Sequence, residues 1–352
     1  MIDFRYHLVS IVAVFLALAI GIVLGSTELQ GDTIDALRSS SNLLKTELNA
    51  SNAQRDSYKQ QLNADQQFLQ APGVEQRLLA NDLMGMRIVL VTEPGASSAV
   101  ISGVEQAAGL AGATVTGEVA LQPAFNDLSG ATQSSLCTLN ADVASTSQAT
   151  LATPSDQLTG CQQDAAQLIA TAIVATTKAG QTQGLSAADG QTLLASYAQG
   201  GYLTTSDSPW NRGTLAVIVT PETVPSGGQN DAASQVLLVL AQEFASLSGA
   251  TVVAGSTAGS ASGSAISVLR SSSVSSQVST VDNADTTIGQ VSTIWALANQ
   301  LAGEKANSYG ISGASAVSPV PSAVPSATPS PSRTPTPHPT KTGKGPKSVK
   351  KK

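Results

Sequence analysis

The distribution of apolar and polar positions divides the chain into four parts. Residues 8–24 read LVSIVAVFLALAIGIVL, seventeen positions without a charge. From residue 34 apolar positions recur at steps of three and four, and from residue 87 short apolar runs alternate with helix-like stretches. From residue 313 Pro, Ser and Thr and then Lys dominate, and the periodicity ends. These changes predict parts over residues 1–26, 27–72, 73–312 and 313–352.

The first apolar run predicts a transmembrane helix that contacts membrane lipid through residues 8–24. At 1.5 Å per residue it spans about 26 Å, close to a hydrocarbon core of roughly 30 Å. One arginine precedes the run and three acids follow it, so the positive-inside rule places the bulk of the chain outside the cytoplasm. A cleaved signal peptide is the alternative, because the residues before Ser26 resemble a cleavage site. In both cases the bulk of the chain is expected in the cell envelope.

The second part predicts a coiled-coil stalk over residues 34–70. Eleven positions keep a heptad register, and seven of them are apolar or aromatic: Ile34, Leu37, Leu44, Leu48, Tyr58, Leu62 and Leu69. A stripe sustained over five heptads favours a coiled coil. Because every copy would leave the same membrane face, we expect a parallel homo-oligomer, most simply a dimer. The alternative is a helix that lies against its own globular domain.

Residues 73–312 predict an α/β domain with a mostly parallel open sheet and flanking helices. The runs at 87–92 and 214–220 are continuously apolar, as in strands buried on both faces. Each is followed by a turn, a helix-like stretch and a second strand, and this alternation favours a parallel sheet. The predicted helices cover residues 97–111, 156–178, 186–199, 231–247 and 287–302. Strands are expected near 114–119 and 251–254, and short apolar pieces lie at 265–269 and 278–281.

The last part, residues 313–352, predicts a disordered Pro/Ser/Thr/Lys tail. The whole chain has a net charge of −6, but residues 1–332 contain all 24 acids and 11 of the 18 basic groups, a net charge of −13. The other seven basic groups lie in the last twenty residues. An anionic wall polymer or lipid surface is a candidate partner for this lysine-rich tail. The alternative is a solvated tail that only keeps the chain soluble.

Composition excludes several classes of function. The negative net charge and an aromatic content of 3% argue against a nucleic-acid partner. With two Cys the chain cannot form a four-Cys zinc site. No histidine occurs between His7 and His338, so the predicted domain cannot contain a Ser-His-Asp triad. We therefore expect no enzymatic activity.

Sulfur ligands for copper are few. Cu(I) prefers thiolate and thioether groups, and Met84 and Met86 form an M-x-M pair where the chain enters the first strand. Packing of these methionines at the strand junction is the favoured alternative. Cys137 and Cys161 are expected to form a disulfide in an oxidising compartment rather than to remain free thiols. Such a bridge would contribute roughly 3 kcal/mol by the loop-entropy model.

Oxygen ligands are offered by Asp282 and Asp285, which follow the 278–281 run. At the carboxyl edge of a sheet they would suit a hard cation, but helix capping by Asp285 or Thr286 is the favoured alternative. The segment from Gly255 to Gly263 follows a strand, as phosphate loops do, yet it lacks their Gly-Lys-Ser/Thr ending. It predicts a flexible loop. No cofactor is expected, and copper enters only as a possible transported ion.

Two stretches of the sequence resemble a known family. FRYHLVSIVAVFLALAIGIVLGS and VSTVDNADTTIGQVSTIWALANQLAGEKANSYG are similar to the actinobacterial MctB family, named for mycobacterial copper transport protein B. Between them, the heptad region, RIVLVT and TVVAGSTAGSASGS follow the family's order, so the resemblance covers about residues 1–311. It implies a cell-envelope protein of copper transport, described for mycobacteria as pore-forming, and a connection with envelope assembly at division septa. It implies no set of catalytic or copper-binding residues.

Two functions follow as hypotheses. The first, implied by the resemblance, is copper transport (efflux) and copper homeostasis as part of an oligomeric assembly in the membrane. The alternative is a non-enzymatic scaffold or interaction protein of the envelope or the division site, which the stalk and the missing catalytic groups favour.

Overall fold

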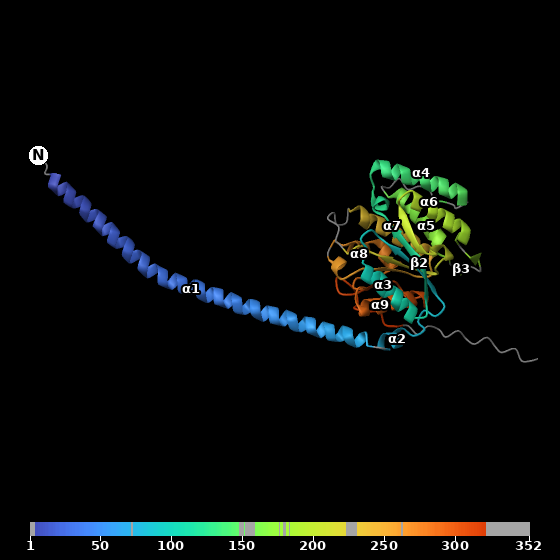
Figure 1. The fold of residues 1–352 in the computed structure, drawn as a ribbon, viewed down its shortest axis with the longest axis horizontal. Helices are drawn as coiled ribbons and strands as arrows, with labels where there is room; N and C mark the ends of the chain where they lie inside the picture. Colours follow the sequence, from blue (N-terminus) through green and yellow to red (C-terminus); the bar gives the residue numbers. More distant parts are fainter. Residues whose placement is uncertain are drawn as a thin grey trace, which may run out of the picture. The chain divides into compact units, whose positions relative to one another are not determined.

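Figure 1 shows the chain as a computed structural model. The structure describes residues 4–71, 73–147, 151, 159–175, 177–178, 181–182, 184–222, 231–261 and 263–321. The chain consists of two compact units, residues 1–71 and residues 72–352.

The first unit is one long helix, α1 (Phe4–Leu69). Its portion Tyr6–Gly25 has a mean hydropathy of 2.9, and among the described residues it is the one helix long and apolar enough to cross a membrane. The helix continues without a break from this portion through the heptad region. No proline occurs before Pro72, so nothing in the sequence removes a backbone hydrogen bond from the helix. The predicted anchor and the predicted stalk are therefore parts of a single element.

The second unit is built on a seven-stranded sheet of order β5-β2-β1-β6-β7-β8-β9. Six of its strands are parallel, and β5 pairs antiparallel with β2 at one edge. The strands are β1 (Arg87–Thr92), β2 (Thr114–Leu121), β5 (Leu203–Asp207), β6 (Leu215–Val219), β7 (Thr251–Ala254), β8 (Ser279–Val281) and β9 (Ser308–Tyr309). A separate two-stranded pair is formed by β3 (Thr177–Lys178) and β4 (Gln181–Thr182). The mixed α/β fold with a mostly parallel sheet confirms the prediction.

Helices cover both faces of the sheet (Figure 1). One face packs against α2 (Val74–Leu79), α3 (Ser98–Leu110) and α9 (Thr287–Leu301). The other face packs against α4 (Gly130–Ser147), α5 (Gly160–Ile173), α6 (Ala187–Gln199), α7 (Ala232–Leu247) and α8 (Ala265–Arg270). Successive residues of β1 and β6 alternate between the two cores, which explains why both strands are continuously apolar.

Short polar residues set the starts of several helices. Ser186 caps α6 through Asp189 N, Asp231 caps α7 through Ala233 N, and Ser264 caps α8 through Ser267 N. Thr286 caps α9 by accepting from Gly289 N. Each side chain satisfies one backbone N–H group that the first helical turn leaves without a partner.

The structure differs from the sequence prediction between α5 and β3. The helix predicted over residues 156–178 begins at Gly160 and ends at Ile173, and residues 156–158 lie outside the described residues. Val174 leaves the helix because it forms a bridge with Gly213, just before β6, and residues 177–178 form β3. Helical periodicity alone does not show that Val174 pairs with Gly213 instead of continuing the helix, because Gly213 lies 39 residues further along the chain.

The predicted start of the tail at residue 313 is too early. Gly310 N donates to Ala316 O at 3.0 Å, Ser292 Oγ to Ser318 Oγ at 2.8 Å and Asn299 Nδ2 to Val320 O at 2.8 Å. Pro319 is buried. The segment up to Pro321 is therefore part of the α/β unit. It is held by hydrogen bonds, which a pattern of apolar residues does not predict. The rest of the predicted tail lies outside the described residues.

Candidate functional site

The loops at the carboxyl edge of the sheet converge where the strand order reverses direction. β1 pairs with β2 on one side and with β6 on the other, so the switch point lies between β1 and β6. Open α/β sheets bind ligands outside this edge at such a point. Here the loops contact one another: Ala96 forms a bridge with Pro221, and Glu222 N donates to Gly95 O at 3.0 Å. Backbone contacts thus close the edge above β1 and β6.

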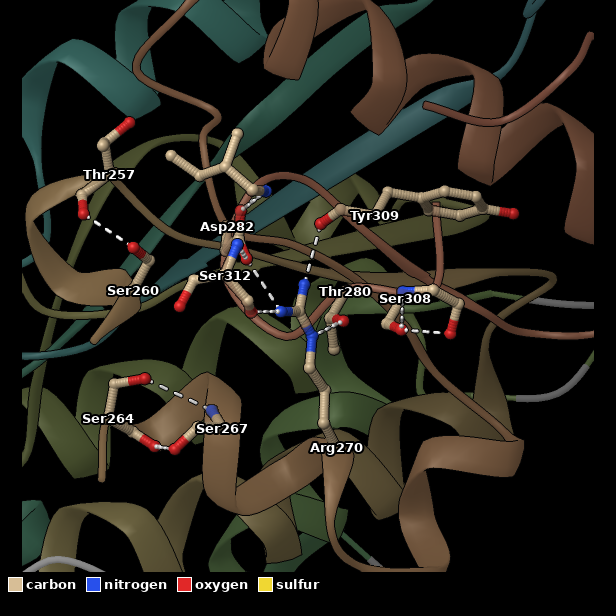
Figure 2. A network of polar contacts seen from close by, with 12 residues as sticks. Thr257, Ser260, Ser264, Ser267, Arg270, Thr280, Asp282, Ser308, Tyr309 and Ser312 are labelled. Atoms are coloured by element: carbon tan, nitrogen blue, oxygen red, sulfur yellow. Dashed lines mark hydrogen bonds and ion pairs between the residues drawn. The ribbon is translucent and has the colours of Figure 1, made fainter. Parts of the chain in front are cut away.

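A buried ion pair joins α8 to Asp282, the residue that follows β8 (Figure 2). Arg270 Nη1 lies 2.7 Å from Asp282 Oδ2, and the two side chains are 9% and 0% exposed. The same guanidinium donates from Nε to Thr280 Oγ1 at 2.8 Å and from Nη2 to Tyr309 O at 2.7 Å, and Nη1 also donates to Ser312 O. Every guanidinium nitrogen therefore has an acceptor.

The remaining acceptor positions of Asp282 are taken by the backbone of the same segment. Ile311 N donates to Asp282 Oδ1 at 2.7 Å, and Ser312 N donates to Asp282 Oδ2 at 2.9 Å. Gly310 follows β9 with φ +124°, and a Cβ there would collide with the Asp282 carboxylate. Asp282 therefore holds Arg270 and the backbone of residues 310–312 together.

Asp285 is also occupied, by the glycine segment that follows β7. Its Oδ1 accepts from Thr257 N at 2.8 Å and from Thr257 Oγ1 at 2.9 Å. The helix that begins next to it is capped by Thr286 and not by Asp285. The segment between Gly255 and Gly263 thus includes a loop tied to the start of α9, with one short helical turn at Ala258–Ser260.

The two methionines of the M-x-M pair have different surroundings. Met84 is 64% exposed, whereas Met86 packs against the core on the α3 and α9 side of the sheet. Thr214 Oγ1 donates to Met86 Sδ at 3.9 Å. Between them Gly85 has φ +75°, so the chain turns at that residue. The two thioethers therefore differ in exposure: Met84 is exposed, and Met86 is half-buried against the core.

The two cysteines link α4 to α5. Cys137 and Cys161 form a disulfide with their Cα atoms 5.0 Å apart. Beside it, Asn140 Nδ2 donates to Cys161 O at 2.7 Å, and Tyr197 Oη donates to Asn140 Oδ1 at 2.6 Å. The disulfide and these hydrogen bonds therefore connect α4, α5 and α6. Neither sulfur is available as a copper ligand while the disulfide is intact.

A groove between α4 and α6 has a volume of about 360 Å³. Leu139, Val143 and Leu193 contribute its apolar surface, and Asp142 and Asp189 contribute two carboxylates. The lining residues include no sulfur or imidazole group, so the groove lacks the soft ligands that Cu(I) prefers. More generally, the described residues include no group of three or more His, Cys, Asp or Glu that could hold a metal ion.

Glu93, which directly follows β1, was not among the residues that the sequence pattern predicted for a site. The side chain is 2% exposed, and neither carboxylate oxygen has a hydrogen-bond partner among the described residues. Burial raises the pKa of the Glu93 carboxyl from 4.5 to about 8, and the negative charge of Asp231 adds to the rise. The signal in the sequence was an acid placed immediately after a strand that is buried on both faces.

Comparison with known proteins gives a consistent result over nearly all described residues. The family described as "Copper transport outer membrane protein, MctB" matches residues 1–321. The protein named copper transporter MctB of Mycobacterium tuberculosis (strain H37Rv) is 29% identical over 316 residues, which cover 88% of this chain and 96% of that protein. The protein of the same name in Mycobacterium leprae is 26% identical over 327 residues, which cover 90% and 99%.

Proposed function

Because the chain belongs to the MctB family of copper transport outer membrane proteins, we propose that it functions in copper transport, in the direction of efflux, and in copper homeostasis at the cell envelope. The observation that carries the proposal is the family match over residues 1–321, which includes the apolar helix, the heptad region and the α/β unit. Copper is the transported ion in this proposal and not a resident cofactor.

Membrane anchoring by α1 is the second element of the proposal. The side chains between Tyr6 and Gly25 are exposed in the chain by itself, and exposed apolar side chains on a helix of this length match a bilayer core. With the N-terminus in the cytoplasm, residues after Gly25 lie outside. Protease added to intact, wall-stripped cells should then digest the region beyond Ser26. Protection of that region, or a mature protein that lacks its first residues, contradicts a retained anchor.

Assembly through the heptad stripe is the third element. The described stripe residues Leu37, Leu44, Leu48 and Leu62 are 61–74% exposed, which is unfavourable in water unless another surface covers them. A single helix encloses no path for an ion, so transport requires several copies or further partners. A parallel homo-oligomer of α1 covers the stripe and brings the anchors of the copies together.

The decisive experiment measures copper in cells that lack the gene. We expect the deletion strain to accumulate copper and to become more sensitive to copper but not to zinc. The complete chain should restore both properties, and a chain that lacks residues 34–70 should fail although it is produced. Unchanged copper content in the deletion strain contradicts the proposed function. In that case changed division or wall assembly would favour the alternative, a non-enzymatic envelope scaffold.

A further inference from the structure

Among the buried polar side chains without a hydrogen-bond partner in the described part of the chain, three belong to the ends of β1 and β6 and the start of α7. Glu93 and Thr220 are each 2% exposed, and Ser234 is 0% exposed. Both carboxylate oxygens of Glu93, Thr220 Oγ1 and Ser234 Oγ lack a partner among the described residues. An unsatisfied buried polar group costs about 1–3 kcal/mol, and more if it is charged. Four such atoms in one region therefore favour a bound ligand that supplies the missing partners.

Strand register brings these residues together. Thr92 of β1 pairs with Val219 of β6, so Glu93 and Thr220 are the next residues on neighbouring parallel strands, and Glu93 N donates to Val219 O at 3.0 Å. Side chains alternate along a strand. Glu93 and Thr220 therefore point to the same face as Val91 and Ile218, which is the face covered by α7.

Helix α7 brings the third residue to this edge. Ser234 lies in the first turn of α7, and like Leu237 it is on the buried side of the helix. The helix starts after Asp231, whose negative charge is close enough to act on Glu93. The switch point between β1 and β6 thus collects one fully buried carboxyl group, two buried hydroxyl groups and a second carboxylate that is partly exposed.

The chemistry of this group selects the type of ligand. The four unpartnered atoms of Glu93, Thr220 and Ser234 are oxygens, which are the preferred ligands of hard cations. No described Lys or Arg forms an ion pair with Glu93. The three side chains are at most 2% exposed, and this burial favours a single ion over an organic molecule. With Glu93 ionised by a bound cation, Glu93 and Asp231 carry two negative charges, which a divalent ion balances.

We propose that Glu93, Thr220 and Ser234 form a binding site for a hard divalent cation such as Ca²⁺, with Asp231 balancing its second charge. Bound there, the ion connects the ends of β1 and β6 to the start of α7. It also reverses the effect of burial on Glu93, because a nearby positive charge favours the ionised form of a carboxyl group. The site therefore combines one buried carboxylate with two hydroxyls and is not a cluster of acids.

The test uses the complete chain in detergent, stripped of metal with a chelator and then freed of the chelator. Calcium chloride and, separately, magnesium chloride are titrated by calorimetry, and the unfolding temperature is followed by circular dichroism. We expect one site per chain and an unfolding temperature that rises with the concentration of the bound ion, since a ligand of the native state stabilises it. Absence of both effects for both ions in the wild-type chain overturns the proposal.

Substitutions locate the site. Glu93→Gln should weaken binding at least about tenfold, the equivalent of about 1.4 kcal/mol. Glu222→Gln is the matched control, because Glu222 is an exposed acid in the segment that follows the neighbouring strand β6, and it should bind as the wild type does. If Glu93→Gln does not fold, Thr220→Val and Ser234→Ala decide the matter. Binding that is unchanged in Glu93→Gln, or in both hydroxyl variants, overturns the proposal. Because no arm involves copper, failure here leaves the proposed transport function unaffected.

Discussion

At the scale of single residues, Asp282 shows how burial decides what a carboxylate does. It follows a strand at the carboxyl edge, where cations often bind, yet both of its oxygens accept hydrogen bonds from within the chain. Its partner Arg270 comes from α8, twelve residues earlier. The pair is therefore structural, and its loss affects folding more directly than metal binding.

The first prediction concerns this ion pair. Asp282→Asn should lower the free energy of unfolding by about 3–5 kcal/mol, because the substitution leaves the Arg270 charge buried without its counter-ion. Urea unfolding of the complete chain in detergent measures the effect. Asp142→Asn is the matched control, since Asp142 is an exposed carboxylate of α4 and should change stability little. Equal stabilities of the two variants would show that Asp282 is not the buried partner of Arg270.

At the scale of elements, the heptad face of α1 is the feature that most needs a partner. Leu44 belongs to the stripe, whereas the adjacent Leu43 lies outside it, and the two are 66% and 70% exposed. Exposure in one copy of the chain therefore does not distinguish them. Only assembly separates their roles, because a coiled coil buries stripe positions and leaves the others in water.

The second prediction uses this neighbouring pair. Leu44→Lys should dissociate the oligomer, because it places a charge in the buried seam of each copy. Leu43→Lys should leave the oligomer intact. Analytical ultracentrifugation of the complete chain in detergent at several concentrations compares the variants. A monomeric wild-type chain, or equal masses for the two variants, would exclude assembly through this stripe.

Other elements show where local pattern is sufficient. β1 and β6 were predicted because an unbroken apolar run satisfies both faces of a buried strand. α4 was not predicted, since hydroxyl-bearing residues interrupt its apolar face, and several of them bond to their own helix, as Ser134 Oγ does to Gly130 O. β5 and β9 escaped prediction as well: the side chains of β5 are mostly exposed, and β9 has two residues.

At the scale of the whole molecule, the C-terminal limit of the α/β unit matters most for designing variants. Composition predicted that order ends at residue 313, but the segment through Pro321 is bonded to β9 and α9. The family match also ends at residue 321. The folded part of the chain therefore includes nine residues that look like linker.

The third prediction follows from that limit. A chain ending at Pro321 should unfold at the same temperature as the complete chain. A chain ending at Ser312 should be less stable by about 2–4 kcal/mol, because it loses several hydrogen bonds worth about 1 kcal/mol each. Calorimetry of the three proteins in the same detergent provides the comparison. If the chain ending at Ser312 is as stable as the others, residues 313–321 do not belong to the folded unit.

The sequence by itself determined the features that depend on local pattern. Three features belong to this group: an uncharged run of seventeen residues, a heptad repeat and two continuously apolar strands. Each can be predicted from a short stretch of sequence, because the interactions that favour it involve neighbouring residues. The family resemblance was visible for the same reason, because its two motifs are contiguous. The expected ends of α3, α6 and α7 agree with the structure to within about two residues, since caps and breakers are also local.

Only the tertiary structure decided which polar residues share a site. Arg270 of α8 pairs with Asp282 after β8, Val174 forms a bridge with Gly213, and Glu93 lies beside Thr220 because β1 pairs with β6. Each of these contacts forms only when the sheet and its covering helices assemble. The free energy of a buried charge depends on what surrounds it in space and not on the residues next to it in the chain. For this reason the partners of Asp282 and Asp285, and the burial of Glu93 at the switch point, became visible only in the fold.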